Sequence, residues 1–347
     1  FTATGKFERA GAAYHRAIET DPRNLDYYLA LTRVQLYAAD YNGALDSVAG
    51  ALLLNSDSAL AYAFRGRALS FLPDRAADAE SDADAEGEIL KALQLNPGLP
   101  EALAFYAEIL ADQGSWEPAA DNARQALALA PNLLEARLAM AYVFESTGNY
   151  DEAIAEYENA QSINPNVPAL YLSLGDNYRA KGEMDTAISH YQKAIALNPN
   201  SAAPYSRIAQ AYGSVGEYGK GSQYAEQAVA LDETNPRLHG LLGRMYYRNN
   251  ELEKSLPEFA LAIQGGAMPS GAQVVGLPPS PGVVAEYYYT YGIALVKLQR
   301  CSQARPIFDL LLATLTADQD EIAVFNAQEG INQCRALEAG AAATPTP

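Results

Sequence analysis

Four prolines recur at a fixed interval along the chain, at Pro97, Pro131, Pro165 and Pro199, each 34 residues after the one before. Three of the four follow an Asn, and three precede one. The residue before a proline is pushed out of the helical region, so each proline marks a place where a helix ends. A period of this length predicts a stack of helical hairpins that contact mainly their neighbours, and not a closed enzyme core.

The clearest unit of the repeat runs over residues 168–201. Its first half, ALYLSLGDNYRAKG, and its second half, DTAISHYQKAIALNP, both place apolar residues at helical spacing, and Gly182 and Glu183 form the turn. We expect the small residues Gly175 and Ala187 to let the two antiparallel helices approach closely. One such hairpin cannot bury enough apolar area to offset its conformational entropy, so neighbouring hairpins must stack.

This unit resembles the tetratricopeptide repeat. The resemblance rests on a large residue at the fourth position, Leu-Gly at the seventh and eighth, Tyr at the eleventh, Ala at the twentieth, an aromatic at the twenty-fourth, Ala at the twenty-seventh and Pro at the thirty-second. Units in the same register begin at Leu134, Pro100, Ala202, Pro236 and Ala285, and weaker ones begin at Leu25 and Ala59. The resemblance implies an all-α fold, a right-handed superhelical solenoid of antiparallel helix pairs with a C-terminal capping helix.

The register also predicts how the chain is divided. We expect a partial N-terminal repeat at 1–24, six repeats at 25–263 with an acidic insertion at 73–88, a Gly/Pro-rich ordered loop at 264–284, a last repeat at 285–316, a capping helix at 317–338 and a tail at 339–347. The first helix of the partial repeat would lie before Phe1. Because the chain starts inside a repeat, we expect an upstream segment, with a targeting signal or an anchor.

The charge of the chain excludes some partners. The net charge is −18, from 42 acidic and 24 basic residues. Such a field repels nucleic-acid phosphate and anionic lipid, so neither is an expected partner. No stretch reaches the roughly 20 apolar residues that a membrane span needs.

Two segments depart from the repeat. In the insertion, every second residue is acidic, at Asp78, Glu80, Asp82, Asp84, Glu86 and Glu88. This pattern fits either a calcium-binding loop or a solvated extension of a hairpin. It lacks the glycine and the spacing of the twelve-residue calcium loop. The loop at 264–284 carries apolar residues among its glycines and prolines, so it is expected either to seal its own solenoid or to reach a groove or a neighbouring chain.

The two cysteines, Cys301 and Cys334, are expected to meet. Cys301 begins the second helix of the last repeat and Cys334 lies near the end of the capping helix, so a turn near Thr316–Asp318 places both at the same end of an antiparallel pair. A disulfide there favours a location outside the cytoplasm, in a secreted, periplasmic or cell-surface protein. Two buried free thiols are the alternative, and a metal site is not expected.

No catalytic arrangement is evident. The three histidines, His15, His190 and His239, occupy different repeat positions, and no phosphate-binding glycine loop or nucleophile elbow occurs. We therefore predict that the chain is not an enzyme and needs no cofactor.

The resemblance implies a concave groove lined by the first helix of each hairpin, at its second, fifth, ninth and twelfth or thirteenth positions. Carried over, these positions include Arg33, Tyr37, Arg67, Glu108, Tyr142, Glu145, Asp176, Arg179, Gln210, Arg244, Tyr247, Arg248 and Tyr289. Tyrosines among charges suit contact with a protein or peptide, or with carbohydrate. The clustered Lys and Asn by which some family members clamp a terminal carboxylate are missing. Alternatively, many of these residues pair with one another across adjacent helices.

Three functions remain open from the sequence, and one of them, an enzyme accessory or periplasmic assembly factor, only a partner would reveal. The first is a non-enzymatic scaffold that binds a protein or peptide in the concave groove. The second is a structural protein whose copies assemble head-to-tail into an extracellular filament or surface layer, because heterologous contacts that do not close give filaments.

Overall fold

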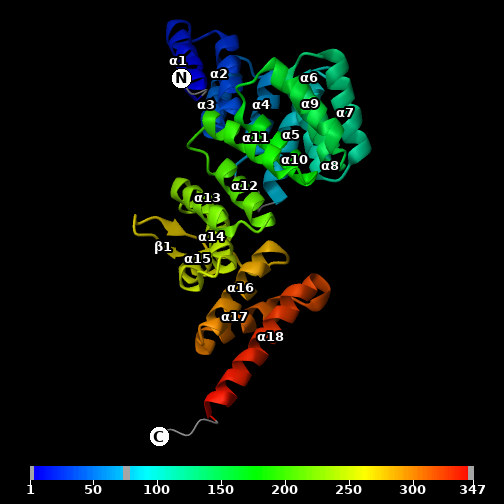
Figure 1. The fold of residues 1–347 in the computed structure, drawn as a ribbon. Helices are drawn as coiled ribbons and strands as arrows, with labels where there is room; N and C mark the ends of the chain where they lie inside the picture. The colour runs from blue at the N-terminus through cyan, green and yellow to red at the C-terminus, as the bar shows by residue number, and fades with distance from the viewer. Residues whose placement is uncertain (1–3, 73–78, 343–347) are drawn as a thin grey trace. The chain divides into compact units, whose positions relative to one another are not determined.

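The computed structural model describes residues 4–72 and 79–342, and helices dominate this part of the chain (Figure 1). The chain forms two compact units, unit 1 (Phe1–Pro199) and unit 2 (Asn200–Pro347). The helices of unit 1 are α1 (Thr4–Thr20), α2 (Leu25–Tyr37), α3 (Tyr41–Leu54), α4 (Ala59–Leu69), α5 (Ala79–Leu95), α6 (Pro100–Asp112), α7 (Trp116–Leu129), α8 (Leu134–Ser146), α9 (Tyr150–Ile163), α10 (Pro168–Ala180) and α11 (Met184–Leu197). Those of unit 2 are α12 (Ala202–Ser214), α13 (Tyr218–Leu231), α14 (Pro236–Arg248), α15 (Leu252–Gln264), α16 (Val283–Lys297), α17 (Cys301–Thr314) and α18 (Ala317–Ala342).

Adjacent helices pack in pairs, which confirms the expected all-α solenoid of helix pairs. The hairpins are α2–α3, α4–α5, α6–α7, α8–α9 and α10–α11 in unit 1, and α12–α13, α14–α15 and α16–α17 in unit 2. In the hairpins α10–α11, α14–α15 and α16–α17, a glycine on the first helix faces an aromatic ring on the second. A Cβ atom on Gly243 would lie 2.9 Å from the ring of Phe259, and one on Gly292 would lie 2.3 Å from the ring of Phe308. The bare glycine backbone therefore sets the distance between the helices.

The turns inside the hairpins follow the same 34-residue period as the prolines. Gly114, Gly148, Gly182 and Gly216 all have positive φ, between 74° and 82°. This left-handed conformation ends a helix and reverses the chain, and glycine adopts it without strain.

The turns between hairpins use the Asn that precedes the proline. In the segment that follows α9, the Asn164 backbone is extended, and its side-chain Oδ1 accepts a hydrogen bond from the Asn166 N–H at 3.1 Å. The Asn96 side chain makes the same contact with Gly98. Asparagine favours such turns because its side chain substitutes for a backbone acceptor.

First helices form one layer of each unit and second helices the other. Consecutive first helices contact each other, as in α6 with α8 and α14 with α16, and among the described second helices no comparable contact is found. A stack that is tight on one side and splayed on the other curves toward the tight side. We call the exposed side of the first-helix layer the inner face.

Unit 1 curves far enough that its first helix meets its fourth hairpin and the start of its fifth. Lys6 Nζ on α1 donates a hydrogen bond to Asn166 Oδ1, between α9 and α10, at 3.1 Å. Phe7 packs against Tyr37 with 6.4 Å between ring centroids, and both rings join the core around α8–α10. Residues 160 positions apart are therefore in contact.

The loop between α15 and α16 packs on its own unit. It contains two short antiparallel strands, β1 (Gly266–Ala267) and β2 (Gln273–Val274), which the sequence did not predict. Val274 is buried, Leu277 packs on the last hairpins, and the Tyr288 hydroxyl donates to the Leu277 carbonyl at 2.8 Å.

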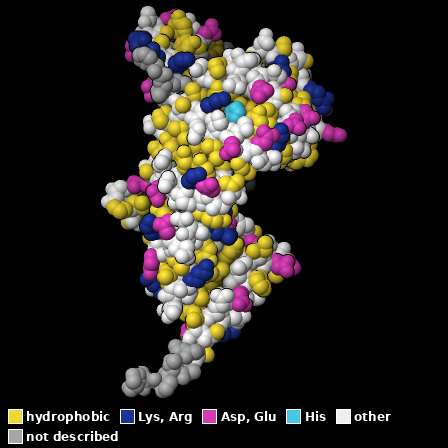
Figure 2. All heavy atoms as spheres, viewed as in Figure 1, with side chains coloured by type: hydrophobic (Ala, Val, Ile, Leu, Met, Phe, Trp, Pro, Cys, Tyr) yellow, Lys and Arg dark blue, Asp and Glu magenta, His cyan; other side chains and the backbone are white. Residues whose placement is uncertain are grey.

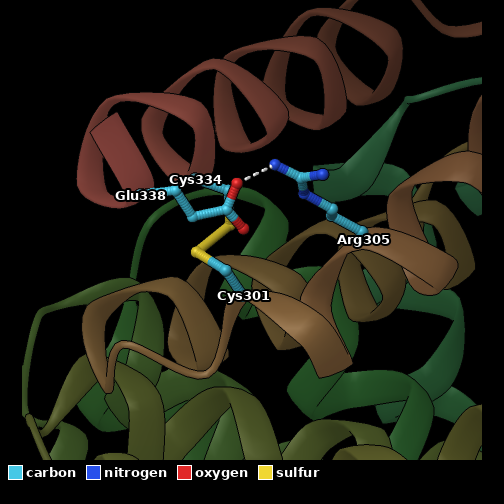
Figure 3. Close-up of a disulfide and its surroundings, with 4 residues drawn as sticks. All are labelled: Cys301, Arg305, Cys334 and Glu338. Carbon is cyan, nitrogen blue, oxygen red and sulfur yellow. Dashed lines mark hydrogen bonds and ion pairs between the residues drawn. A yellow bond between two sulfur atoms is a disulfide. The ribbon is translucent and has the colours of Figure 1, made fainter. Parts of the chain in front are cut away.

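The α18 helix covers the last hairpin and carries the expected disulfide. Cys301, at the start of α17, is bonded to Cys334 on α18, with 5.5 Å between their Cα atoms. Figure 3 shows the bond beside an ion pair between Arg305 and Glu338, which joins the same two helices. Helix α18 is interrupted at Asp320, whose Oδ1 accepts the Ala323 N–H at 2.9 Å and so restarts the helix.

Part of the acidic insertion falls outside the described structure. The side chains of Asp78, Glu80, Asp82 and Asp84 and the last residues of the tail, 343–347, are not described. Glu88 pairs with Arg65 across the α4–α5 hairpin, and Glu86 accepts a hydrogen bond from Gln113 at 2.9 Å. These two carboxylates therefore already have partners in the protein.

Candidate interaction surface

The candidate surface is the inner face, and in unit 1 its N-terminal end is crossed by side chains of α2. Arg33 Nη2 lies 2.6 Å from Glu101 Oε1 on α6, and Arg33 Nε lies 3.3 Å from Glu135 Oε1 on α8. The Tyr37 hydroxyl donates to the same Glu135 oxygen at 2.8 Å. Burial and the neighbouring Glu135 carboxylate raise the pKa of Tyr37, so the phenol stays protonated and keeps donating.

A pocket opens beside this crossing, and we call it the central pocket. It has a volume of about 250 Å³ and is lined by Arg67 of α4, Glu108 of α6 and Tyr142 of α8. These are the ninth residues of three consecutive first helices, so the sequence-predicted residues do converge here. Arg67 is ion-paired with Glu108 and lies over the ring of Phe71.

The electrostatics of the central pocket favour positive charge. Burial raises the pKa of the Glu108 carboxyl, and the Arg67 guanidinium offsets part of that rise. Asp112, one helical turn further along α6, accepts a hydrogen bond from the Tyr142 hydroxyl and also lines the pocket. Two carboxylates thus face one guanidinium at its walls.

The walls of the central pocket also have apolar parts. Ile109, Leu138 and Leu170 line it, together with Tyr157 from the second helix α9. The Tyr157 hydroxyl donates to Glu145 Oε2 at 2.8 Å, and Asn177 Nδ2 donates to the same oxygen at 2.8 Å. Glu145 therefore orients neighbouring side chains within the protein.

The last predicted residues of unit 1 pair with each other. Asp176 Oδ1 accepts a hydrogen bond from the Tyr191 hydroxyl at 2.8 Å and one from Arg179 Nη2 at 3.4 Å. This cluster links the two helices of the α10–α11 hairpin and lies apart from the residues that line the central pocket.

In unit 2 the predicted residues are paired less completely. Arg244 Nη1 lies 2.9 Å from Glu286 Oε2 on the next first helix. Tyr247, Tyr289 and Gln210 are half-buried, and Arg248 is exposed. Burial and the nearby Glu286 carboxylate raise the pKa of Tyr289, an effect that Arg248 opposes. Figure 2 shows acidic and basic side chains interspersed with apolar ones over the visible face of the molecule.

Sequence reasoning missed several residues of the inner face. Glu101, Glu135 and Glu286 all stand at the second position of a repeat, and Asp112 and Lys297 at the thirteenth. The groove pattern covers those positions, so the sequence alone also indicates these residues. Tyr157 carried no such signal, because it belongs to a second helix.

No group of three or more His, Cys, Asp or Glu side chains in residues 4–72 and 79–342 has an arrangement that could hold a metal ion. Within those ranges, no helix combines the length and the apolar character of a membrane span.

Sequence models of known repeat families match three segments of the chain. A sequence model described as TPR repeat matches residues 175–216, and two described as Tetratricopeptide repeat match residues 134–177 and 206–272. No curated protein sequence matches the chain. Together the matched segments span residues 134–272, which include the unit at 168–201.

Solved structures of repeat proteins resemble parts of the chain. A thermophilic TPR protein from Thermus thermophilus shares 21% identity over 50% of this chain and 94% of that one, with a TM-score of 0.46. A tetratricopeptide repeat protein from Parabacteroides merdae shares 19% identity over 70% of this chain and 93% of that one, also with a TM-score of 0.46. The MamA protein shares 22% identity over 46% of this chain and 90% of that one, with a TM-score of 0.39.

Proposed function

The chain belongs to the tetratricopeptide repeat family, and from that premise we propose that it is a non-enzymatic scaffold that binds a segment of a partner protein on its inner face. The fold is that of a protein-interaction scaffold. The observation that carries the finer proposal is the central pocket, where three consecutive first helices each contribute their ninth residue, Arg67, Glu108 and Tyr142.

The chemistry of the central pocket indicates what it accepts. A lysine or arginine side chain of the partner has an apolar stem that suits Leu138 and Leu170, and a cationic end that suits Glu108 and Asp112. A second cation would also stabilise the ionised form of Glu108, whose pKa burial raises. We therefore propose that the bound segment carries a basic residue.

The proposed location is outside the cytoplasm. The disulfide between Cys301 and Cys334 supports it, because such bonds persist in oxidising compartments and are rare where glutathione keeps thiols reduced. Alkylation of the protein in its source cells before lysis tests this: cysteines protected until a reductant is added support the proposal, and thiols that react at once count against it.

Selection of displayed peptides on the full chain tests the binding function. We expect enriched peptides to share a Lys or Arg, and we expect the variant that combines Glu108→Gln with Asp112→Asn to bind them about tenfold more weakly. Glu117→Gln, which removes one charge from the first turn of α7, is the control and should bind as the wild type does. Equal binding by all three proteins would remove the central pocket from the proposal.

A further inference from the structure

Unit 2 has basic side chains on its first helices that have no acidic partner. Arg237, Arg248 and Lys297 form no ion pair with any described residue, and all three are exposed. Each occupies the second or thirteenth position of its repeat, on α14 or α16. In a chain with 42 acidic and 24 basic residues, three such cations in one layer of helices call for an explanation.

Two of these cations lie beside tyrosines, and we call this group the cationic surface: Tyr247, Arg248, Tyr289 and Lys297. Lys297 Nζ lies 4.5 Å from the centre of the Tyr247 ring. Arg248 is close enough to Tyr289 to act on its hydroxyl electrostatically. Both tyrosine rings pack on the hydrophobic core around α16 and α17, so they are held in place as rigid contact area.

The two carboxylates that act electrostatically on Tyr289 already have partners within the protein. Glu286 is ion-paired with Arg244 at 2.9 Å. Asp320 accepts the Gly282 N–H through Oδ2 at 2.9 Å and the Ala323 N–H through Oδ1 at 2.9 Å. The charges of Arg248 and Lys297 are therefore left for an anion from outside the chain.

We propose that the cationic surface binds an acidic segment of a partner protein, with carboxylates on Arg248 and Lys297 and an apolar or aromatic side chain against Tyr247 and Tyr289. Tyrosine and arginine are the residues that most often dominate the energetics of protein interfaces. The proposal rests on the scaffold function above but on a different surface, so it does not depend on the central pocket.

A protein segment fits this surface better than a nucleic acid does. Screening confines the field of exposed charges to about 8 Å at physiological ionic strength, so a short acidic segment meets mainly the local cations. A nucleic acid carries a charge at every nucleotide and would extend over the surrounding surface of a chain whose net charge is −18.

Fluorescence anisotropy on the full chain tests the proposal. The probe is a labelled peptide that repeats Glu-Leu-Asp four times, compared with its uncharged counterpart, which repeats Gln-Leu-Asn. We expect the acidic probe alone to bind, and we expect added salt to weaken it. Replacing both Arg248→Gln and Lys297→Gln should raise its dissociation constant roughly three- to tenfold.

A matched control separates a local effect from a change in net charge. Arg335→Gln removes another unpaired and exposed cation of unit 2, which lies on α18 and not on a first helix. It should bind as the wild type does, and Glu108→Gln should also leave this binding unchanged. The proposal is wrong if the acidic probe fails to bind, if Arg335→Gln weakens it as much as the double variant does, or if a labelled single-stranded oligonucleotide binds more tightly.

Discussion

Gly175 lies directly against the ring of Tyr191: a Cβ atom added to Gly175 would be 2.3 Å from Cε1 of that ring. Tyr191 is completely buried and is hydrogen-bonded to Asp176, so the ring has no room to move away. We expect Gly175→Ala to lower the free energy of unfolding by about 1–3 kcal/mol through overpacking. Chemical denaturation of both proteins measures the difference.

The control for this substitution is a helical glycine with space around it. Among the described residues, no atom outside its own helix backbone and its two chain neighbours lies within 4 Å of a Cβ added to Gly87 on α5. Gly87→Ala should therefore stabilise the protein by up to about 1 kcal/mol, the difference in helix propensity. If both variants were equally stable, close packing at Gly175 would not set the distance between the helices.

The hairpins could be predicted from the sequence because their determinants are local. The spacing from Gly175 to Tyr191 recurs from Gly243 to Phe259, and within one hairpin two residues sixteen positions apart must face each other. The disulfide could be predicted for the same reason, since Cys301 and Cys334 lie in consecutive helices.

The curvature of unit 1 could not be predicted in this way. The contacts of Arg33 with Glu101 and Glu135 join residues 68 and 102 positions apart, and they depend on small rotations that accumulate over three hairpins. The residues of a single repeat do not determine this accumulated rotation. The two-residue strands β1 and β2 were also missed, because they are too short to show an alternating pattern.

Ala39, which follows α2, has a left-handed backbone conformation that it shares with Asn250 and Gln299 at the equivalent positions of two other hairpins. Its φ is 60°, and the equivalent residues of four other hairpins are glycines with φ between 74° and 82°. Because the left-handed region costs an L-residue about 1–2 kcal/mol, Ala39→Gly should raise the free energy of unfolding, by about 1 kcal/mol after the entropy of glycine is counted. Thermal and chemical unfolding measure the gain.

Ala38, the residue before Ala39, provides the control substitution. Ala38 has φ −81° and a right-handed conformation, so Ala38→Gly should destabilise the protein. Opposite signs for the two adjacent Ala→Gly substitutions are the result that their opposite backbone conformations predict, and a loss of stability in both would contradict strain at Ala39.

His239 should make the stability of unit 2 depend on pH. The ring is 1% exposed, with Nδ1 2.7 Å from Glu258 Oε2 and Nε2 2.9 Å from the Glu233 carbonyl oxygen. Burial alone would lower the pKa of His239, but these two acceptors outweigh it and raise the pKa above its usual value near 6.5. Only the protonated ring can donate to both.

The sign of the effect follows from the raised pKa. The stabilisation is fully present below the unfolded pKa of about 6.5 and is lost as the pH rises through the higher pKa of the folded state. The stability difference between the wild type and His239→Gln should therefore shrink as the pH increases across that window. A difference that is constant with pH would mean that folding does not shift the pKa of His239.

The disulfide between Cys301 and Cys334 should hold α18 on the last hairpin. It closes a loop of 33 residues, for which the chain-entropy model gives a stabilisation of about 3–4 kcal/mol. Helix α18 also packs Ala323 and Ala327 into the core and places Gly330 against the ring of Phe308. We therefore expect the variant that combines Cys301→Ala with Cys334→Ala to stay folded but to open this helix far more often.

Native-state hydrogen exchange resolves that effect by region, because local opening is reported separately for each segment. Protection should fall in α17 and α18 and remain unchanged in the helices of unit 1. Reductant should reproduce the pattern in the wild type and add nothing in the double variant. If reductant destabilised the wild type and the double variant equally, or if protection fell throughout the chain, the disulfide would not act locally to hold α18 on the last hairpin.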